Sequence, residues 1–208
     1  MKKLIVLLFS MGISAAAWGA AAATAESAAP LAVGTAVPAA TVHATDGSAV
    51  DLADVVGDKP TVLIFYRGGW CPYCNRHLEA LQTIEADLLA LGYQIIALSP
   101  DRPEALPATT EKNHLNYRLL SDRTMAAADA YGVAFVVPDE IVEKYGQWNI
   151  DLAPLPGDET KRWLPVPAVF IIAHGEVRFV HSEVDYKVRL STEDMLAAAK
   201  ASATAAAD

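Results

Sequence analysis

The stretch that decides the fold is Phe65-Tyr66-Arg67-Gly68-Gly69-Trp70-Cys71-Pro72-Tyr73-Cys74, which contains the only two cysteines of the 208-residue chain. Just before its glycines, Thr61 to Tyr66 is a continuous apolar run that follows Pro60, a pattern typical of a central strand in a parallel or mixed sheet. After the cysteines, His77 to Leu91 carries apolar residues at three- and four-residue steps, which predicts a helix packed on that sheet. Both sulfurs are therefore expected where a buried strand is followed by the N-terminus of a helix.

This position favours negative charge on sulfur. Unpaired N–H groups and the helix dipole stabilise an anion at a helix N-terminus, and cysteines in such settings have low thiol pKa values. We expect Cys71, at an exposed tip before the helix, to have the lower pKa and to attack first. Cys74 would then act as the resolving cysteine, which attacks oxidised Cys71, since the two sulfurs are close enough in sequence to form and exchange a disulfide.

The spacing of the cysteines favours redox chemistry over a structural role. A disulfide across so short a loop removes little entropy from the unfolded chain, about 2 kcal/mol. A structural staple or a pair of inert thiols is the alternative. As a redox centre, the thiolate would attack a disulfide, or a hydroperoxide oxygen to give a sulfenic acid with which the second cysteine condenses.

The N-terminus has the layout of a cleaved secretory signal. Met1-Lys2-Lys3 is a short basic start, Leu4 to Ala17 is an uncharged apolar run, and Ala-x-Ala cleavage frames such as Ala23-Thr24-Ala25 follow. We assign residues 1–25 to a signal peptide and processing region, and expect a periplasmic or secreted protein without stable membrane insertion after cleavage. A membrane anchor is the alternative, disfavoured because the apolar run is short for a span of about 20 residues.

Composition limits the remaining choices. Without Lys2 and Lys3 the chain has 14 basic and 25 acidic residues, a formal charge of −11. No basic stripe of the sort that follows phosphates is present, so nucleic acid is not expected as a partner. The part after the signal, about 180 residues, is long enough for one domain with a proper core, and we place that domain at residues 31–200.

Strand and helix signals alternate along this domain and predict an α/β fold, a central mixed sheet flanked by helices. Gln94 to Ser99 completes a right-handed βαβ unit, and Ala168–Ile172 and Val177–Val180 form a hairpin around His174-Gly175. Other short elements are expected at Val37–Val42, Val50–Leu52, Leu52–Val56, Thr109–His114, Tyr117–Leu120, Met125–Tyr131 and from Met195. Phe135 to Trp163, with one helix at Asp139 to Tyr145, is long for a simple connection, and we interpret it as a cover over the site.

Taken together, these features resemble the thioredoxin fold, and more narrowly the alkyl hydroperoxide reductase/thiol-specific antioxidant (AhpC/TSA) family of peroxiredoxin-like proteins. The resemblance covers about Ala32 to Leu196. It is carried by the stretch 65–74 and by Asp46-Gly47, Leu120-Ser121-Asp122, Ala130-Tyr131-Gly132-Val133, Phe170-Ile171-Ile172 and Asp185-Tyr186-Lys187-Val188-Arg189. The resemblance implies an antioxidant thiol oxidoreductase that reduces hydroperoxides through a reversible Cys71–Cys74 disulfide, without a cofactor, using electrons from a thioredoxin-like donor.

The chain departs from both family patterns. Aligned on Phe65-Tyr66, the peroxidatic cysteine of peroxiredoxins falls at Cys74 and their Thr or Ser at Cys71. Their proline falls at Arg67 and their late arginine at Pro167. Aligned as a thioredoxin, Cys71 is the nucleophile, Cys74 resolves, and the usual buried Asp is replaced by Ile64. The identity of the attacking cysteine and the choice between a hydroperoxide and a protein-disulfide substrate therefore stay open.

Six neighbours are expected to support the cysteines: Arg67, Trp70, Pro72, Tyr73, Val166 and Pro167. Arg67 would stabilise a thiolate or orient a peroxide, unless it is a surface arginine. Pro167 is expected to be cis after Val166 and to pack against the cysteines, with an ordinary strand-initiating proline as the alternative. Trp70 and Tyr73 would form an apolar rim. Arg189 is expected in a structural ion pair, with reach to the active face as the alternative.

His77 extends the motif to Cys-x-x-Cys-x-x-His and raises the question of a metal. Three ligands at helical spacing do not make the closed four-ligand set of a structural zinc site. His181, on the late hairpin, would have to complete a copper site as in thioredoxin-fold copper chaperones, which use a longer cysteine spacing. We therefore expect no metal, and keep a copper chaperone as the third hypothesis, behind a peroxidase and a protein-disulfide reductase.

Overall fold

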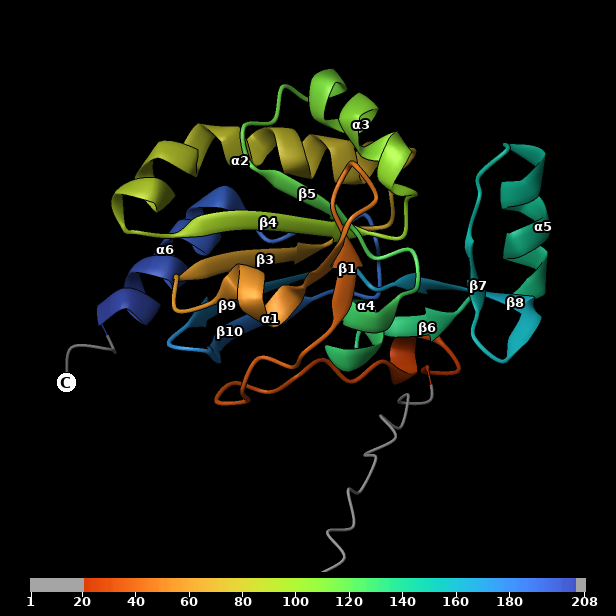
Figure 1. Cartoon of the computed structure of the whole chain (residues 1–208), viewed down its shortest axis with the longest axis horizontal. Helices are drawn as coiled ribbons and strands as arrows, with labels where there is room; N and C mark the ends of the chain where they lie inside the picture. The colour runs from red at the N-terminus through yellow and green to blue at the C-terminus, as the bar shows by residue number, and fades with distance from the viewer. Residues whose placement is uncertain (1–20, 205–208) are drawn as a thin grey trace, which may run out of the picture.

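The computed structural model describes residues 21–204, which are built around a seven-stranded mixed sheet (Figure 1). The strands in their order across the sheet are β10 (Glu176–Ser182), β9 (Ala168–Ala173), β3 (Thr61–Phe65), β4 (Gln94–Ser99), β5 (Arg118–Ser121), β1 (Thr41–His43) and β2 (Ala49–Asp51). β3, β4 and β5 run parallel, and β9 pairs antiparallel with β3. The predicted α/β fold with a central mixed sheet is confirmed.

Helices cover both faces of the sheet. One face packs against α2 (Pro72–Ala90), α3 (Leu106–Lys112) and α6 (Thr192–Thr204), and the other against α1 (Leu52–Val56) and α4 (Ala126–Ala130). Successive side chains of β3 alternate between the two cores because a strand has a side-chain period of two. Val62 and Ile64 join the α2 side, while Leu63 and Phe65 join the α1 side. β3 is fully buried for this reason.

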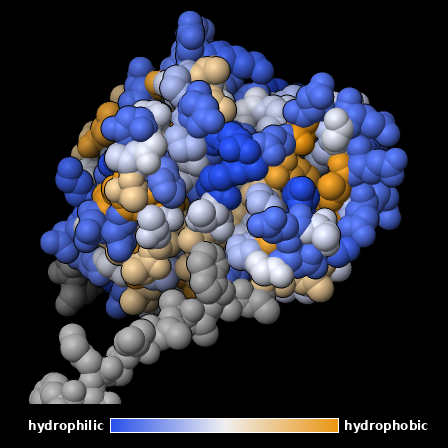
Figure 2. Space-filling view, turned by 45° about the vertical axis from the view of Figure 1, so that its right-hand side comes forward, coloured by the Kyte–Doolittle hydropathy of each residue, from blue (hydrophilic) through white to orange (hydrophobic). Residues whose placement is uncertain are grey.

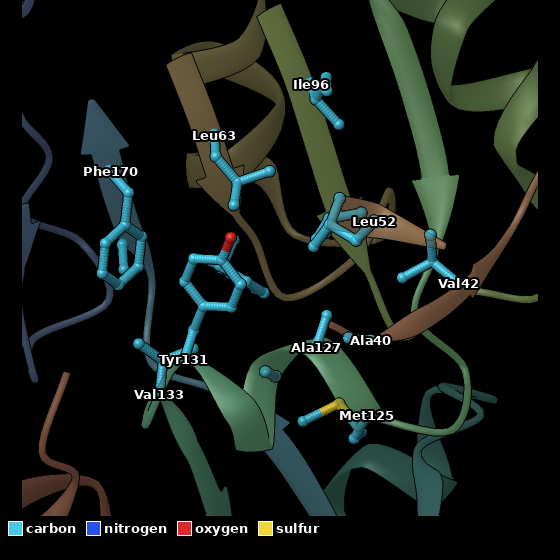
Figure 3. Close-up of a cluster of buried hydrophobic side chains, with 14 of the residues drawn as sticks. Ala40, Val42, Leu52, Leu63, Ile96, Met125, Ala127, Tyr131, Val133 and Phe170 are labelled. Atoms are coloured by element: carbon cyan, nitrogen blue, oxygen red, sulfur yellow. The ribbon is translucent and has the colours of Figure 1, made fainter. Parts of the chain in front are cut away.

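The core on the α1 side is organised around an aromatic group. Tyr131, just after α4, lies beside Phe65 and Phe170, with ring centroids 5.2 and 5.1 Å away. Figure 3 shows the Tyr131 hydroxyl pointing toward Leu63, with Phe170 on one side of the Tyr131 ring and Ala127 and Met125 on the other. Tilted and edge-on ring contacts stabilise the packing beyond the burial of the rings. The end of α4 is therefore fixed against the sheet whose strand β3 leads to the cysteine loop.

The excursion between α4 and β9 is more structured than the sequence indicated. It contains β6 (Ala134–Val136), α5 (Asp139–Gln147), β7 (Ala153–Leu155) and β8 (Asp158–Pro165), and its strands form a second sheet in the order β6-β8-β7. Only α5 was predicted. Figure 1 shows α5 and the loop before β7 standing out at the right of the molecule. A small core of its own, which includes Tyr145, Leu152 and Leu164, holds this unit together.

The end of the predicted signal peptide and processing region, residues 21–25, and the residues just after it are folded onto the small sheet. Ala22 pairs with Phe135 of β6 through two backbone hydrogen bonds, and Ala25–Ser27 forms a 3₁₀ turn. A second such turn, Pro103–Ala105, precedes α3. The signal-peptide prediction itself falls on residues 1–25, of which 1–20 lie outside the described residues. No helix within 21–204 is long and apolar enough to span a membrane.

Candidate active site

The loop between β3 and α2 holds the cysteines, and its two glycines are required by close approaches. Gly68 has φ +140°, a conformation that L side chains rarely adopt, and a Cβ there would collide with Trp70 and with Asp101 Oδ1. A Cβ on Gly69 would collide with the hydroxyl of Thr109 on α3. The backbone therefore passes so close to its neighbours that only glycine fits at both positions.

Side chains from the neighbouring strand and helices fix this loop. The Gly69 N–H donates to Asp101 Oδ2 at 2.7 Å, and the Gly69 carbonyl accepts from Asn75 Nδ2 at 2.8 Å. Asn113 in turn donates to Asn75 Oδ1 at 3.2 Å. Burial raises the pKa of Asp101, and the hydrogen bonds from the Gly69 N–H and the Ser99 hydroxyl lower it in part. The loop is thus held rigidly before the first turn of α2.

Cys71 is the N-cap of α2 and Pro72 its first residue. The Cys71 sulfur accepts the Cys74 backbone N–H at 3.4 Å and lies 2.6 Å from the Cys74 sulfur, whose thiol donates to it. Proline at this position costs the helix no hydrogen bond. A thiolate on Cys71 therefore receives a helix N–H, as the sequence predicts for this position, and in addition the thiol proton of Cys74.

The two thiols differ in acidity because of this asymmetric contact. The hydrogen bond from the Cys74 thiol, followed by the Cys74 backbone N–H and the charges of Arg67 and Arg189, lowers the pKa of Cys71 to about 6 from 9.0, despite its burial. Burial first, then the contact with Cys71, raises the pKa of Cys74 well above 9.0. Near neutral pH Cys71 is a thiolate and Cys74 a thiol.

The expectation that Cys71 lies at an exposed tip is wrong. Only 1% of the residue is exposed. It nevertheless lines a cleft of about 330 Å³ whose wall is mostly apolar. The cleft is formed by Arg67, Trp70, Cys71, Pro72 and Tyr73 together with Ile141, Lys144, Tyr145, Trp148, Ile150 and Tyr186. Figure 2 shows hydrophobic surface among hydrophilic side chains on the side of the molecule that carries α5.

Arg67 is a buried cation enclosed by aromatic rings rather than a surface arginine. Its guanidinium lies 4.0 Å from the centre of the Tyr186 ring, 5.2 Å from that of Trp70 and 5.5 Å from that of Tyr145. It also donates to the Tyr145 hydroxyl. Only 6% of Arg67 is exposed, so its charge acts through apolar surroundings, where charges interact strongly. This is why it lowers the pKa of Cys71.

The structure corrects the prediction for Pro167. The Val166–Pro167 bond is trans, since the described residues contain no cis peptide bond. The Val166 N–H donates to Val133 O at 2.8 Å and the Pro167 carbonyl accepts from Glu183 N at 3.4 Å. The chain thus continues in an extended form from β8 into β9, and it makes no turn that would require a cis bond. Pro167 lies beside His77 and His181, outside the cleft of Cys71.

Arg189 also differs from its prediction. Its Nη2 lies 3.4 Å from the Cys74 sulfur, and the ion pairs found between residues 21 and 204 do not include it. Its neighbour His77 is buried, and burial together with the charge of Arg189 lowers the pKa of His77 to about 4. In the described part of the chain no cluster of three or more His, Cys, Asp or Glu side chains is placed to hold a metal.

Several residues of the site had no usable signal in the sequence. Tyr145 lies in α5, Trp148 caps the end of that helix, and Tyr186 lies in the loop after β10, so all three reach the cysteines from more than 70 positions away. The interpretation of residues 135–163 as a cover indicated the segment but not the side chains. Of the predicted supporting residues, Arg67, Trp70, Pro72 and Tyr73 line the cleft, and Val166 and Pro167 do not.

Comparison with known proteins agrees with this geometry. The sequence profile described as the AhpC/TSA family matches residues 33–180. The chain belongs to the AhpC/TSA family. Among its relatives, the putative peroxiredoxin bcp of Haemophilus influenzae is 35% identical over 104 residues, which are 50% of this chain and 66% of the relative. Peroxiredoxin Bcp of Escherichia coli K12 is 31% identical over a segment that covers the same shares. The aligned part therefore spans slightly less than two thirds of these relatives.

Solved structures of this family share the fold. Reduced Prx3 from Vibrio vulnificus, in complex with hydrogen peroxide, has a TM-score of 0.66 at 20% identity and covers 81% of this chain and 99% of its own. Peroxidoxin BcpB from Mycobacterium tuberculosis has a TM-score of 0.60 at 20% identity and covers 81% and 96%. A more distant relative, 23% identical over 103 residues, is the thiol-disulfide oxidoreductase ResA of Halalkalibacterium halodurans, of which 57% is covered. The predicted membership of the AhpC/TSA family and the thioredoxin-like, peroxiredoxin-like fold are thus confirmed.

Proposed function

We propose that this AhpC/TSA protein is a thiol-dependent peroxidase that reduces hydroperoxides through a reversible Cys71–Cys74 disulfide. The observation that carries the proposal is the Cys71 sulfur, which lines an apolar cleft with Arg67 beside it and a second cysteine in contact behind it. Nucleophilic attack on a peroxide requires a thiolate that is formed at neutral pH and lies on the wall of a cleft that a small oxidant can enter.

The reaction follows from the positions of the two sulfurs. The Cys71 thiolate attacks the outer oxygen of ROOH, the O–O bond breaks, and the alkoxide takes a proton and leaves as the alcohol. Cys71 is then a sulfenic acid. Cys74 attacks its sulfur, the S–O bond breaks, and the hydroxide leaves with the proton of Cys74 as water. Two thiols of a thioredoxin-like donor finally reduce the disulfide by exchange.

The walls of the cleft favour binding of organic hydroperoxides over binding of hydrogen peroxide. Its lining is aromatic and aliphatic apart from Arg67 and Lys144, and apolar surface removed from water stabilises a complex by about 25 cal/mol per Å². Arg67 supplies the fixed positive charge that stabilises negative charge developing on the peroxide oxygen.

Single-cysteine variants test the proposal. Reduced wild-type protein, Cys71→Ser and Cys74→Ser would each be mixed with hydrogen peroxide and with cumene hydroperoxide, and a dimedone adduct would be located by mass spectrometry. We expect a fast adduct on Cys71 in Cys74→Ser and none in Cys71→Ser. An adduct on Cys74 instead would exchange the roles of the cysteines, and oxidation no faster than that of free cysteine would refute the peroxidase.

A protein-disulfide reductase is the second candidate function. The Cys-x-x-Cys arrangement and the ResA relative favour it. Turnover of insulin disulfides by the wild-type protein, in the absence of a fast reaction with hydroperoxides, would select this alternative.

We further propose that the protein is exported to the periplasm or secreted, on the basis of the N-terminal residues alone. Expression of the full chain in a Gram-negative host tests this point. Recovery of a shortened chain from the periplasm would support export, and a full-length chain in the cytosol would contradict it.

A further inference from the structure

The guanidinium of Arg189 is directed at the sulfur that the cleft does not reach. Arg189 lies on the loop between β10 and α6, where its Nη1 donates to the Val188 carbonyl at 2.7 Å and its Nη2 to the Cys74 sulfur at 3.4 Å. The ion pairs found among the described residues leave it without a carboxylate. Its positive charge is therefore available to the sulfur.

Cys74 has few other groups that can stabilise a negative charge. The residue is 1% exposed and does not line the cleft of Cys71. The polar groups that act on its sulfur are the Cys71 sulfur, the Arg67 backbone N–H and Arg189. The buried hydroxyl of Tyr66 also lies near it and is uncharged, since burial raises the pKa of Tyr66 well above 10.0. Arg189 is thus the cation in contact with this sulfur.

Oxidation of Cys71 changes the electrostatic environment of the Cys74 sulfur. While Cys71 is a thiolate, its hydrogen bond and its charge both hold the proton on Cys74. Once Cys71 is a neutral sulfenic acid, its negative charge is gone and the negative charge must form on Cys74. Burial then opposes the thiolate, and Arg189 is the charge in place to offset it.

We propose that Arg189 is a catalytic residue of the second step, in which its guanidinium stabilises negative charge on the Cys74 sulfur during attack on the Cys71 sulfenic acid. This proposal rests on the peroxidase function proposed above. The S–S bond forms as the S–O bond breaks; the Cys74 sulfur is oxidised, the sulfenic sulfur is reduced, and hydroxide leaves with the thiol proton as water. The same contact stabilises Cys74 as the leaving group when the donor reduces the disulfide.

The surroundings of Arg189 agree with this role. His77, one helical turn after Cys74, lies beside Arg189 and His181. Because burial lowers the pKa of His77 to about 4, His77 is uncharged near neutral pH and does not repel the guanidinium.

The test compares Arg189→Met and Arg189→Lys with the wild-type protein. The matched control is Lys187→Met, which removes an exposed cation two residues away. In a single mixing experiment with cumene hydroperoxide, Arg189→Met should slow disulfide formation about tenfold or more, because a charged hydrogen bond to the attacking sulfur is lost. Formation of the sulfenic acid should change much less. Dimedone adduct and sulfinic acid on Cys71 should accumulate, Arg189→Lys should recover part of the rate, and Lys187→Met should behave as wild type.

Equal slowing of both steps, or an unchanged rate of disulfide formation in Arg189→Met, would overturn the proposal. A second measurement needs no peroxide, so it tests the role of Arg189 even if the protein does not reduce peroxides. In Cys71→Ser the pH at which the Cys74 thiolate forms, followed by its ultraviolet absorbance relative to the variant that lacks both thiols, should rise when Arg189→Met is added, because the cation in contact with the sulfur is lost. Absence of that rise overturns the role of Arg189 whatever the substrate. Circular dichroism of each variant shows whether it is folded, and Arg189→Lys serves where Arg189→Met does not fold.

Discussion

At the residue scale, two cysteines three positions apart have opposite properties because one caps a helix and the other lies inside it. The Cys71 sulfur accepts hydrogen bonds from a backbone N–H and from the Cys74 thiol, while Cys74 is enclosed and its thiol is the donor. Residue type alone cannot tell them apart. The contacts assign the thiolate to Cys71, and the cleft that Cys71 lines makes the same sulfur the one that meets a substrate.

The acidity of Cys71 leads to a prediction on pH. In wild-type protein, alkylation of Cys71 by iodoacetamide, followed by mass spectrometry, should reach half its maximal rate near pH 6. Cys74→Ala should move this midpoint toward 9, since it removes the largest cause of the low pKa. Arg67→Met should move it less. A midpoint above 8 in the wild type would contradict the assignment.

The same pKa difference has a consequence for stability. Because the pKa of Cys71 is lower in the folded than in the unfolded chain, ionisation stabilises the reduced protein fully above pH 9, and this contribution is lost as the pH falls through about 6. The free energy of unfolding of the wild type relative to Cys71→Ser should therefore increase between pH 6 and pH 9. Denaturant titrations of both proteins over that range measure it.

The loop glycines give a second prediction at this scale. Gly69→Ala places a methyl group against the Thr109 hydroxyl and should lower the free energy of unfolding by about 2 kcal/mol, as overpacking does. Gly146→Ala is the matched control, since it lies in α5 with open space around it, and alanine is the better helix former by about 1 kcal/mol. Urea titrations should show opposite signs, and equal effects would count against the close approach.

At the element scale, α5 and the loop after β10 complete the site that the loop before α2 begins. α5 and its C-cap contribute Tyr145 and Trp148, and the later loop contributes Tyr186 and Arg189. Tyr186 touches both Arg67 and Tyr73, with its ring 5.7 Å from that of Tyr73. The cleft is therefore built by three segments that are distant in sequence.

Trp148, at the outer end of α5, provides the prediction for this scale. It is 58% exposed and lines the cleft, so Trp148→Ala should change stability by no more than about 0.5 kcal/mol. It should raise KM for cumene hydroperoxide about threefold, because apolar contact with the substrate is lost, and leave hydrogen peroxide turnover unchanged.

Leu89→Ala is the matched control for Trp148→Ala. Leu89 is 57% exposed near the end of α2, away from the cleft. Steady-state kinetics of both variants with both peroxides test whether Trp148 contacts the organic group of the substrate. An equal loss on both peroxides, or the same effect from Leu89→Ala, would show that Trp148 does not select for the organic group.

At the scale of the whole molecule, the sequence predicted what local patterns determine and missed what distant segments build together. The βαβ unit, the late hairpin and the place of the cysteines depend on strand runs, helical spacing and breakers near one another in the chain. The aromatic enclosure of Arg67 depends on Tyr145 and Tyr186, and the contact of Arg189 with Cys74 joins residues 115 positions apart. No periodicity encodes such meetings, so Arg189 was assigned to an ion pair, and Pro167 was expected beside the cysteines.

The small sheet was missed for a related reason, and it supports a last prediction. Two of its strands, β6 and β7, have three residues each, and β7 and β8 contain Pro154 and Pro165, residues that usually end strands. β6 is nevertheless extended at its edge by Ala22 through two backbone hydrogen bonds. A chain that begins at Pro30 loses these bonds and the contact of Ala29 with Gly132. Compared with a chain that begins at Ala21, it should be less stable by about 1–2 kcal/mol. The alkylation midpoint of Cys71 should stay the same, because Ala22 is absent from the set of residues that lines the cleft. Equal urea midpoints would mean that residues 21–29 contribute nothing to the fold, and a shifted alkylation midpoint would mean that they influence the site through β6.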